Sequence, residues 1–248
     1  LGIALDGDGD RLIMVDSRGT VYDGDQLLYA IVRHRSKDKV SGVVGTLMTN
    51  LAFEQALERL GIAFARARVG DRYVLELLRE KGWLLGGENS GHLICLDKHT
   101  TGDGIVSALQ VLHAVRESGR SLAELTAGLV MYPQVLLNVK VAKRFDPKQI
   151  QAVQDAVSSI ESRLGGEGRV VLRASGTEPV IRVMVEGRHE GMTRALATEL
   201  ADVVRSAFGH AGQKCSAASL VIVVGSVGRS ERFRRQLVDA ASSLRVGF

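Results

Sequence analysis

The sequence is poor in cysteine, proline and aromatic residues, and it contains no long apolar run. Its 248 residues include two cysteines, three prolines and 4% aromatic residues. The two cysteines, Cys95 and Cys215, are far apart, which argues against a disulfide framework and fits a reducing compartment. The longest aliphatic run, residues 220–224, is far shorter than the ~20 residues that span a bilayer. We therefore expect a cytoplasmic protein with no membrane segment.

The chain also has little net charge outside its C-terminal part. The net charge is +4, but residues 212–248 hold six basic and two acidic residues, so the rest of the chain is neutral. A neutral body has no global field that would attract a polyanion. This argues against nucleic-acid binding, except by the basic C-terminal segment.

The sequence begins at Leu1, inside an apolar stretch and without a methionine. No leader-like segment precedes the first expected strand, so we expect this chain to be the interior of a longer protein. Beyond that start, glycine is abundant, with 28 residues. Many glycines with few prolines are typical of α/β proteins that bind ligands with tight loops.

Strand-like and helix-like patterns alternate along the first half of the chain. Two short strands, 3–5 and 12–15, flank an Asp/Gly loop, and further strands are expected at 40–46, 62–70 and on both sides of "GGENSGH". Helical periodicity covers 24–34, 50–60, 71–81 and 100–118. This alternation indicates an α/β layer domain with parallel strand pairing. After a break near Tyr132 and Pro133, a strand, a helix, two strands and a helix indicate an α+β unit.

Three carboxylates stand at alternate positions in the Asp/Gly loop: Asp6, Asp8 and Asp10, followed by Arg11. Alternate side chains of an extended segment point the same way, so the three carboxylates can converge on a cation. Hard oxygen ligands favour Mg²⁺ or Ca²⁺. An EF-hand loop is excluded, because Arg11 takes the place of its glycine and Ser17 that of its last glutamate. A solvated turn is the alternative.

Polar side chains also gather in two later loops. "RASGTEP" offers Arg173, the hydroxyls of Ser175 and Thr177, and the backbone of Gly176. These groups suit a phosphate-binding loop, to which Arg182 could add charge, although a plain hairpin turn is the alternative. In "GGENSGH", Glu88 and Ser90 suit sugar hydroxyls, and His92 is a proton-transfer candidate or a structural histidine.

Asp71 and Arg72 stand at the start of an expected helix, in "VGDRYV". They are candidate ligand residues only if this end of the helix faces the other loops. Otherwise Gly70 and Asp71 merely cap the helix.

Several sequence motifs together match one family in their residues and in their order along the chain. They are "GIALDGDGDR", "YDGDQLLY", "ARARVGDRYVLE", "GGENSGHLICLDKHTTGDGIVSALQVL" and "LRASGTEPVIRVMVEG". With them, the chain resembles the α-D-phosphohexomutases from residue 1 to about residue 208. The resemblance implies a mixed-sheet α/β layer domain followed by an α+β C-terminal domain. Residues 1–20 would end the family's second domain, 21–132 would form the third, sugar-binding domain, and 133–209 the fourth, phosphate-binding domain.

The resemblance also implies an activity and a role for each motif. The family moves a phosphoryl group between the 6- and 1-oxygens of a hexose, and the wording of the motifs favours glucosamine phosphate over glucose or mannose phosphate. The implied metal ligands for Mg²⁺ are Asp6, Asp8 and Asp10, with Arg11 beside them and His92 near the sugar. The implied phosphosugar ligands are Asp71, Arg72, Glu88, Ser90, Arg173, Ser175, Gly176, Thr177 and Arg182.

Two departures from the family limit these expectations. The nucleophilic serine of an "S-H-N-P"-type motif is missing from the chain, so we expect the missing N-terminal domains as partners and no activity by this chain alone. The alternative is a remnant that binds a phosphosugar or Mg²⁺ without catalysis. A homodimer is a further possible assembly. Residues 210–248 depart from the family, and we expect a foreign extension there or, alternatively, a small basic interaction segment. "GSVGRS" in this segment fits neither a P-loop nor a dinucleotide-binding loop.

Overall fold

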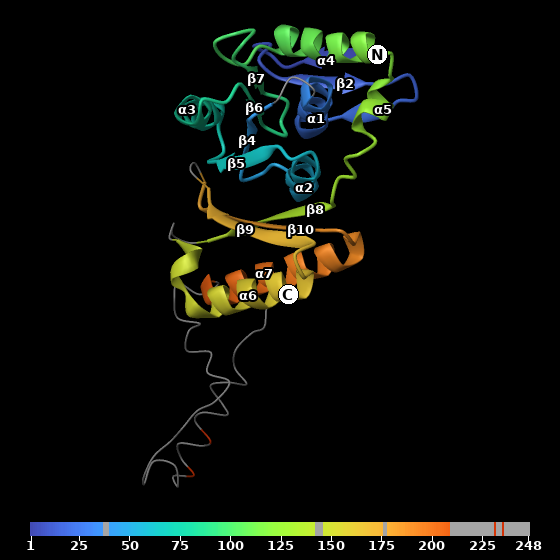
Figure 1. Cartoon of the computed structure of the whole chain (residues 1–248). Helices are drawn as coiled ribbons and strands as arrows, with labels where there is room; N and C mark the ends of the chain where they lie inside the picture. Colours follow the sequence, from blue (N-terminus) through green and yellow to red (C-terminus); the bar gives the residue numbers. More distant parts are fainter. Residues whose placement is uncertain (37–39, 142–145, 176–177, 209–230, 232–234, 236–248) are drawn as a thin grey trace.

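The structure is a computed structural model that describes residues 1–36, 40–141, 146–175 and 178–208, with 231 and 235. Within these residues the chain forms three β-sheets with helices packed against them (Figure 1). An α/β layer is followed by an α+β unit, which confirms the expected fold class. No described helix is both long enough and apolar enough to cross a bilayer.

The first sheet is a hairpin that carries the Asp/Gly loop. Strands β1 (Gly2–Leu5) and β2 (Leu12–Val15) pair in antiparallel fashion, and the short β3 (Val21–Tyr22) joins the other edge of β2. Side chains alternate across a strand, so Leu12 and Met14 are buried while their neighbours are half-buried. The residues of β1 are all exposed, so the hairpin is attached to the rest of the molecule through β2.

The central unit is a four-stranded sheet between helices. Its strands β4 (Gly42–Thr46), β5 (Ala63–Ala67), β6 (Leu85–Gly87) and β7 (Leu93–Cys95) lie in the order β5-β4-β6-β7. The helices are α1 (Gly24–Arg35), α2 (Leu51–Arg59), α3 (Asp71–Lys81), α4 (Gly104–Ser118) and the short α5 (Leu122–Thr126).

The sheet is mixed, as the resemblance implied, although the alternating pattern alone predicted parallel pairing. Strand β4 is parallel to β5 and β6, as the alternating pattern predicted, but β7 runs antiparallel to β6. Residues 88–92 connect β6 to β7, and a parallel connection needs a crossover of a dozen or more residues. The short loop therefore forces a hairpin, and the sheet is mixed.

Consecutive residues of β4 face two different cores. Val43 lies in the larger core with β2, α1 and α2, and Val44 lies in a smaller core with α3. Because side chains of a strand alternate between the two faces, a run of buried residues indicates a strand covered on both sides. All five residues of β4 are buried, so this strand is the centre of the layer.

The C-terminal unit is an antiparallel sheet with two helices on one face. Strands β8 (Gln134–Lys140), β9 (Gly168–Ala174) and β10 (Val180–Gly187) lie in the order β8-β10-β9, and α6 (Gln151–Leu164) and α7 (Glu190–Phe208) cover one face. Figure 1 shows the other face turned toward α2. The first helix expected in this unit is interrupted, because Ile150 is extended between a 3₁₀ turn (Pro147–Gln149) and α6.

Candidate functional site

The three aspartates of the first loop converge. Asp6, Asp8 and Asp10 each offer a carboxylate oxygen within 4.8 Å of the others, and they are the acidic group with this geometry in the described chain. The turn is closed by the N–H of Gly9, which donates to the carbonyl of Asp6 at 3.2 Å. Three neighbouring carboxylates repel each other unless positive charge lies beside them.

Arg11 supplies part of that charge. Its backbone N–H donates to Asp6 Oδ1 at 3.1 Å, and its guanidinium lies 3.8 Å from Asp6 and 4.0 Å from Asp10. Desolvation opposes ionisation of Asp6, but the N–H and the guanidinium of Arg11 outweigh it and lower the pKa of this carboxyl. The loop is therefore an anionic site with one cation already at its rim, and its donor set fits a hard divalent ion.

Backbone contacts join this loop to the loop between β6 and β7. Leu12 donates to the carbonyl of Gly91 at 3.0 Å, and Gly104, the first residue of α4, donates to the carbonyl of Gly9 at 2.9 Å. Gly91 has φ +100°, and a Cβ there would lie 2.3 Å from the carbonyl oxygen of Leu12. Only glycine allows this approach, so the two loops form one assembly.

His92 is the side-chain link within this assembly. The residue is 3% exposed, and its Nδ1 lies 3.0 Å from Asp10 Oδ2. Its Nε2 is buried and has no hydrogen-bond partner among the described residues. Gly102 packs against the ring so closely that a Cβ would lie 2.0 Å from Nε2. The contact with Asp10 ties the loop between β6 and β7 to the acidic loop.

Glu88 is 7% exposed and has one partner from α3. The N–H of Gly70, just before α3, donates to Glu88 Oε1 at 2.8 Å. The structure therefore brings the start of α3 to this loop, as the ligand hypothesis for Asp71 and Arg72 requires. The guanidinium of Arg72, however, pairs with Glu76 at 2.7 Å on the surface, and Asp71 and Ser90 are exposed.

In the C-terminal sheet, Arg173 and Arg182 stand directly opposite each other on β9 and β10. Burial lowers the pKa of Arg173, and the charge of Arg182 lowers it further. Like charges placed opposite each other destabilise a strand pair. Neither arginine has a carboxylate partner among the salt bridges of the described residues. The pair therefore forms an unneutralised cationic patch.

Asn138 continues this row on β8, where it is the register partner of Arg182. It is exposed, and the sequence analysis did not select it. Its only signal was an amide in the middle of an otherwise apolar strand pattern, "QVLLNVKVA".

The hydroxyl of Ser175 has a structural partner. Ser175 is 3% exposed, and its Oγ accepts from the N–H of Glu178 at 3.3 Å, which closes the turn. The oxygen is the acceptor in that contact, and no contact with a described residue uses the hydroxyl hydrogen as a donor. Gly176 and Thr177, the other predicted loop ligands, lie outside the described residues.

The candidate site residues lie on three successive β-sheets. Figure 1 shows the hairpin of the acidic loop and the C-terminal sheet on either side of the four-stranded sheet, which carries the loop of Glu88. The fold thus defines a multidomain α/β protein whose candidate site is distributed over successive loops.

Family models cover most of the described chain. The phosphoglucomutase/phosphomannomutase α/β/α domain III matches residues 23–132, and the C-terminal domain of the same family matches residues 136–203. The chain belongs to the α-D-phosphohexomutase superfamily.

Curated phosphoglucosamine mutases match the chain at high identity. The chain is 60% identical over 209 residues to the phosphoglucosamine mutase of Thiobacillus denitrificans, covering 84% of this chain and 46% of the relative. It is 63% identical over 206 residues to that of Dechloromonas aromatica, covering 83% and 46%. The chain thus spans about half the length of the curated relatives it matches.

Solved structures share the fold. One is the Aspergillus fumigatus N-acetylphosphoglucosamine mutase in complex with GlcNAc-6P and magnesium, with a TM-score of 0.70, 24% identity and coverage of 83% of this chain and 48% of that chain. Another is a phosphoglucomutase/phosphomannomutase family protein from Burkholderia thailandensis, with a TM-score of 0.65, 19% identity and coverage of 83% and 46%. At these identities the likeness concerns the fold alone.

A different family matches the end of the chain. The aldehyde dehydrogenase family model covers residues 192–248, and it overlaps the match of the C-terminal domain model over residues 192–203, within α7. Except for 192–208, 231 and 235, this region lies outside the described residues, and so does the "GSVGRS" motif.

Proposed function

We propose that this chain supplies the metal-, sugar- and phosphate-binding parts of a phosphoglucosamine mutase, which interconverts glucosamine 6-phosphate and glucosamine 1-phosphate. The product would serve the synthesis of UDP-N-acetylglucosamine and cell-wall precursors. Identity near 60% to phosphoglucosamine mutases supports glucosamine phosphate as the substrate. Glucose and mannose phosphates are the alternatives within the family, which is described as phosphoglucomutase/phosphomannomutase.

The observation that carries the proposal is the facing pair Arg173 and Arg182. Two guanidinium groups at one rung, without a carboxylate partner among the described residues, favour a dianion between them. A sugar phosphate is such a dianion near neutral pH. Arg173 and Arg182 would hold the phosphate that does not react, together with the Ser175 hydroxyl and the loop residues Gly176 and Thr177.

The loop between β6 and β7 would hold the sugar. Glu88 is buried and keeps one carboxylate oxygen, Oε2, free of the contact with Gly70, so it can accept from sugar hydroxyls. Ser90 is exposed at the same loop and can donate or accept. Asp71 would contribute from the start of α3, whereas Arg72 would first have to leave Glu76.

The acidic loop would hold Mg²⁺ through Asp6, Asp8 and Asp10, whose converging oxygens fit such an ion. Bound there, the ion acts as a Lewis acid that offsets charge on the reacting phosphoryl oxygens. Arg11 would neutralise a further oxygen beside the loop. His92 would hold Asp10 in place through Nδ1, and a role in proton transfer stays a prediction.

The expected reaction passes through a phosphoserine enzyme and a 1,6-bisphosphate. The bisphosphate has to reverse its orientation in the site between the two phosphoryl transfers, so either of its phosphates must fit the same donors. The arginines of the C-terminal sheet would serve both orientations, since positioning and charge neutralisation carry most of phosphoryl-transfer catalysis. The relatives extend well beyond the matched region, and the serine would come from that part of the protein.

Titration calorimetry of the 248-residue chain tests this proposal. With Mg²⁺ present, we expect binding of glucosamine 6-phosphate in preference to glucose or mannose 6-phosphate, and no turnover. Arg173→Ala should weaken binding by at least about tenfold, as expected for the loss of one charge-assisted contact. Arg163→Ala is the matched control, because its partner Glu199 lies on the helical side of the same unit. Equal affinities of both variants for glucosamine 6-phosphate would refute the phosphate assignment, and turnover by the chain alone would refute the need for a serine domain.

We also propose the expected boundaries of the three family units, 1–20, 21–132 and 133–209, as units of this site. Residues 210–248 would lie outside it as a foreign extension, which the second family match supports. Deletion of 210–248 should leave phosphosugar affinity unchanged in the same calorimetric assay.

A further inference from the structure

One rung of the C-terminal sheet faces the four-stranded sheet with three polar residues. Glu186 on β10 pairs with Gln134 on β8 and with Arg169 on β9. Arg173 and Arg182 lie four residues further along the same strands, and residues at even separations share a face. The rung of Glu186 and the rung of the proposed phosphate site therefore lie on the same face of one rigid sheet.

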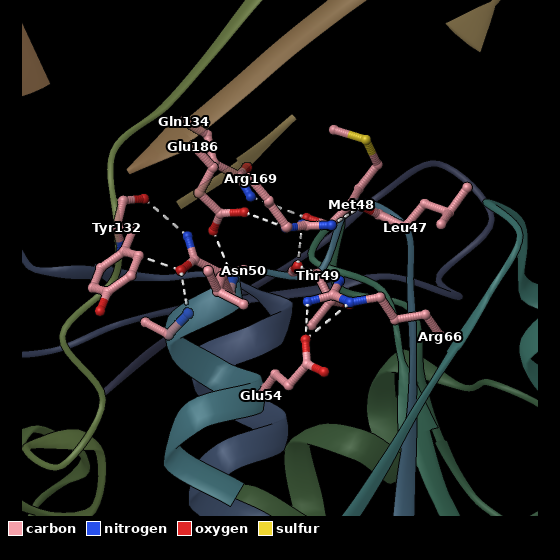
Figure 2. A network of polar contacts seen from close by, with 12 residues as sticks. Leu47, Met48, Thr49, Asn50, Glu54, Arg66, Tyr132, Gln134, Arg169 and Glu186 are labelled. Atoms are coloured by element: carbon pink, nitrogen blue, oxygen red, sulfur yellow. Dashed lines mark hydrogen bonds and ion pairs between the residues drawn. The ribbon is translucent and has the colours of Figure 1, made fainter. Parts of the chain in front are cut away.

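All three members of the Glu186 rung contact one loop of the central unit, residues 47–51. Arg169 donates to the carbonyls of Leu47 at 2.9 Å and Thr49 at 2.6 Å. Gln134 donates to the carbonyl of Met48 at 3.2 Å. Figure 2 shows these side chains converging on the loop that leads from β4 to α2.

Glu186 caps a helix of the other unit. It is fully buried, its Oε1 accepts from the N–H of Leu51 at 2.6 Å, and its Oε2 accepts from Arg169 at 2.6 Å. Leu51 is the first residue of α2, and a carboxylate at a helix N-terminus is stabilised by the helix dipole. The ion pair thus joins a fully buried Glu186 to a half-buried Arg169, and both side chains also bond the loop of residues 47–51.

Further contacts lead from residues 47–51 to the loop between β6 and β7, which holds Glu88 and is named the sugar loop. The N–H of Asn50 donates to Asp25 Oδ2 at 2.8 Å, and the N–H of Gly24, which precedes Asp25 in α1, donates to the carbonyl of Asn89 at 3.0 Å. The side chain of Asn50 also bonds the backbone of Tyr132, at the connection between the two units. Glu186 is therefore linked to the loop of Glu88 by three hydrogen bonds whose residues are neighbours along the backbone.

We propose that the rung of Gln134, Glu186 and Arg169, seated on residues 47–51, is the joint that sets the phosphate-binding arginines at the right distance from the sugar loop. These three are positioning residues and do not touch the substrate. The inference deepens the proposed function and rests on it for the nature of the ligand. Its geometrical part, the joint, stands on the contacts alone.

Arg169→Lys tests the joint with little disturbance of the fold. Lysine keeps the charge but cannot reach Glu186 and both carbonyls at once, because it lacks the planar fork of arginine. By calorimetry, affinity for glucosamine 6-phosphate, which must bridge both units, should fall about tenfold. Affinity for inorganic phosphate, which needs only the arginine pair, should change by less than about twofold. Hydrogen exchange of the Leu51 amide should become faster.

Arg163→Lys is the matched control, since Arg163 forms its ion pair with Glu199 within the C-terminal unit. Glu186→Gln is a second variant that keeps the size of the side chain and should give the same pattern. Equal losses for phosphate and phosphosugar, or no loss for either, would overturn the positioning role. If the unmodified chain binds no phosphosugar, the proposed function fails, and the joint is then judged by exchange alone: unchanged exchange at Leu51 in both variants would overturn it.

Discussion

A buried carboxylic acid next to the joint gives a prediction about stability and pH. Asp25 is 2% exposed and accepts from the N–H of Asn50 at 2.8 Å. Burial, and after it the charge of Asp23, raise the pKa of Asp25 to about 8, although the N–H of Asn50 opposes the shift. Glu186 also raises this pKa, and Arg66 lowers it.

The direction of the effect on stability follows from this raised pKa. The folded protein keeps a proton on Asp25 that the unfolded chain releases above its ordinary pKa of 3.8. Below pH 3.8 the proton on Asp25 therefore makes its full contribution to the free energy of unfolding. This contribution is lost as the pH rises toward 8. Each pKa unit corresponds to about 1.36 kcal/mol, so the window from about pH 5 to pH 8 is worth at most about 4 kcal/mol. With a pKa of about 8, the carboxyl is only half-ionised in the folded protein at pH 8, so the change within this window is roughly 2–4 kcal/mol.

Asp25→Asn removes the ionisation and keeps an oxygen that can accept from Asn50. We expect the free energy of unfolding of this variant, relative to the unmodified chain, to rise by roughly 2–4 kcal/mol between about pH 5 and pH 8. Urea unfolding at several pH values measures it, with Asp155→Asn on the exposed face of α6 as the control. A constant difference between Asp25→Asn and the unmodified chain across this range would refute the reasoning.

Two further substitutions test the acidic loop and its junction. Asp8→Asn removes one of three converging carboxylates, and calorimetry should show Mg²⁺ affinity at least about tenfold lower; unchanged affinity would contradict the metal assignment. Gly91→Ala puts a Cβ 2.3 Å from the backbone of Leu12 at φ +100°, and should cost at least about 2 kcal/mol in thermal unfolding. Gly61→Ala, at φ +70° in open space, is its control and should cost about 1 kcal/mol; equal costs would mean that the loops are not tightly joined.

Most helices and strands could be predicted because their signals are local. The helix expected at 71–81 is found with those bounds, since Gly70 precedes it and Gly82 ends it in the left-handed conformation. The helix expected over 100–118 begins at Gly104, where the side chain of Asp103 caps it. The strand pattern alone does not give the antiparallel direction of β7, because pairing depends on the length of the connecting loop; the mixed sheet was expected only from the resemblance.

The candidate site could be predicted where several of its residues are neighbours in sequence, as in the loop of Asp6, Asp8 and Asp10. The contact of His92 with Asp10 and the joint at Glu186 could not, because their partners are distant in sequence. Glu186 and Leu51 are separated by 135 residues. A glutamate near the end of a strand pattern gives no sign of burial, and only the packing of the two units shows that it caps a helix.

We expect the loop of Glu88 and the arginines of the C-terminal sheet to bind one hexose phosphate between them. A crystal structure of the chain with glucosamine 6-phosphate and Mg²⁺ tests it most directly. We predict the phosphate between Arg173 and Arg182, the sugar hydroxyls on Glu88 and Ser90, and the ion on the acidic loop. A phosphosugar bound elsewhere, for example in the pocket of about 350 Å³ lined by His34 and Trp83, would contradict the account.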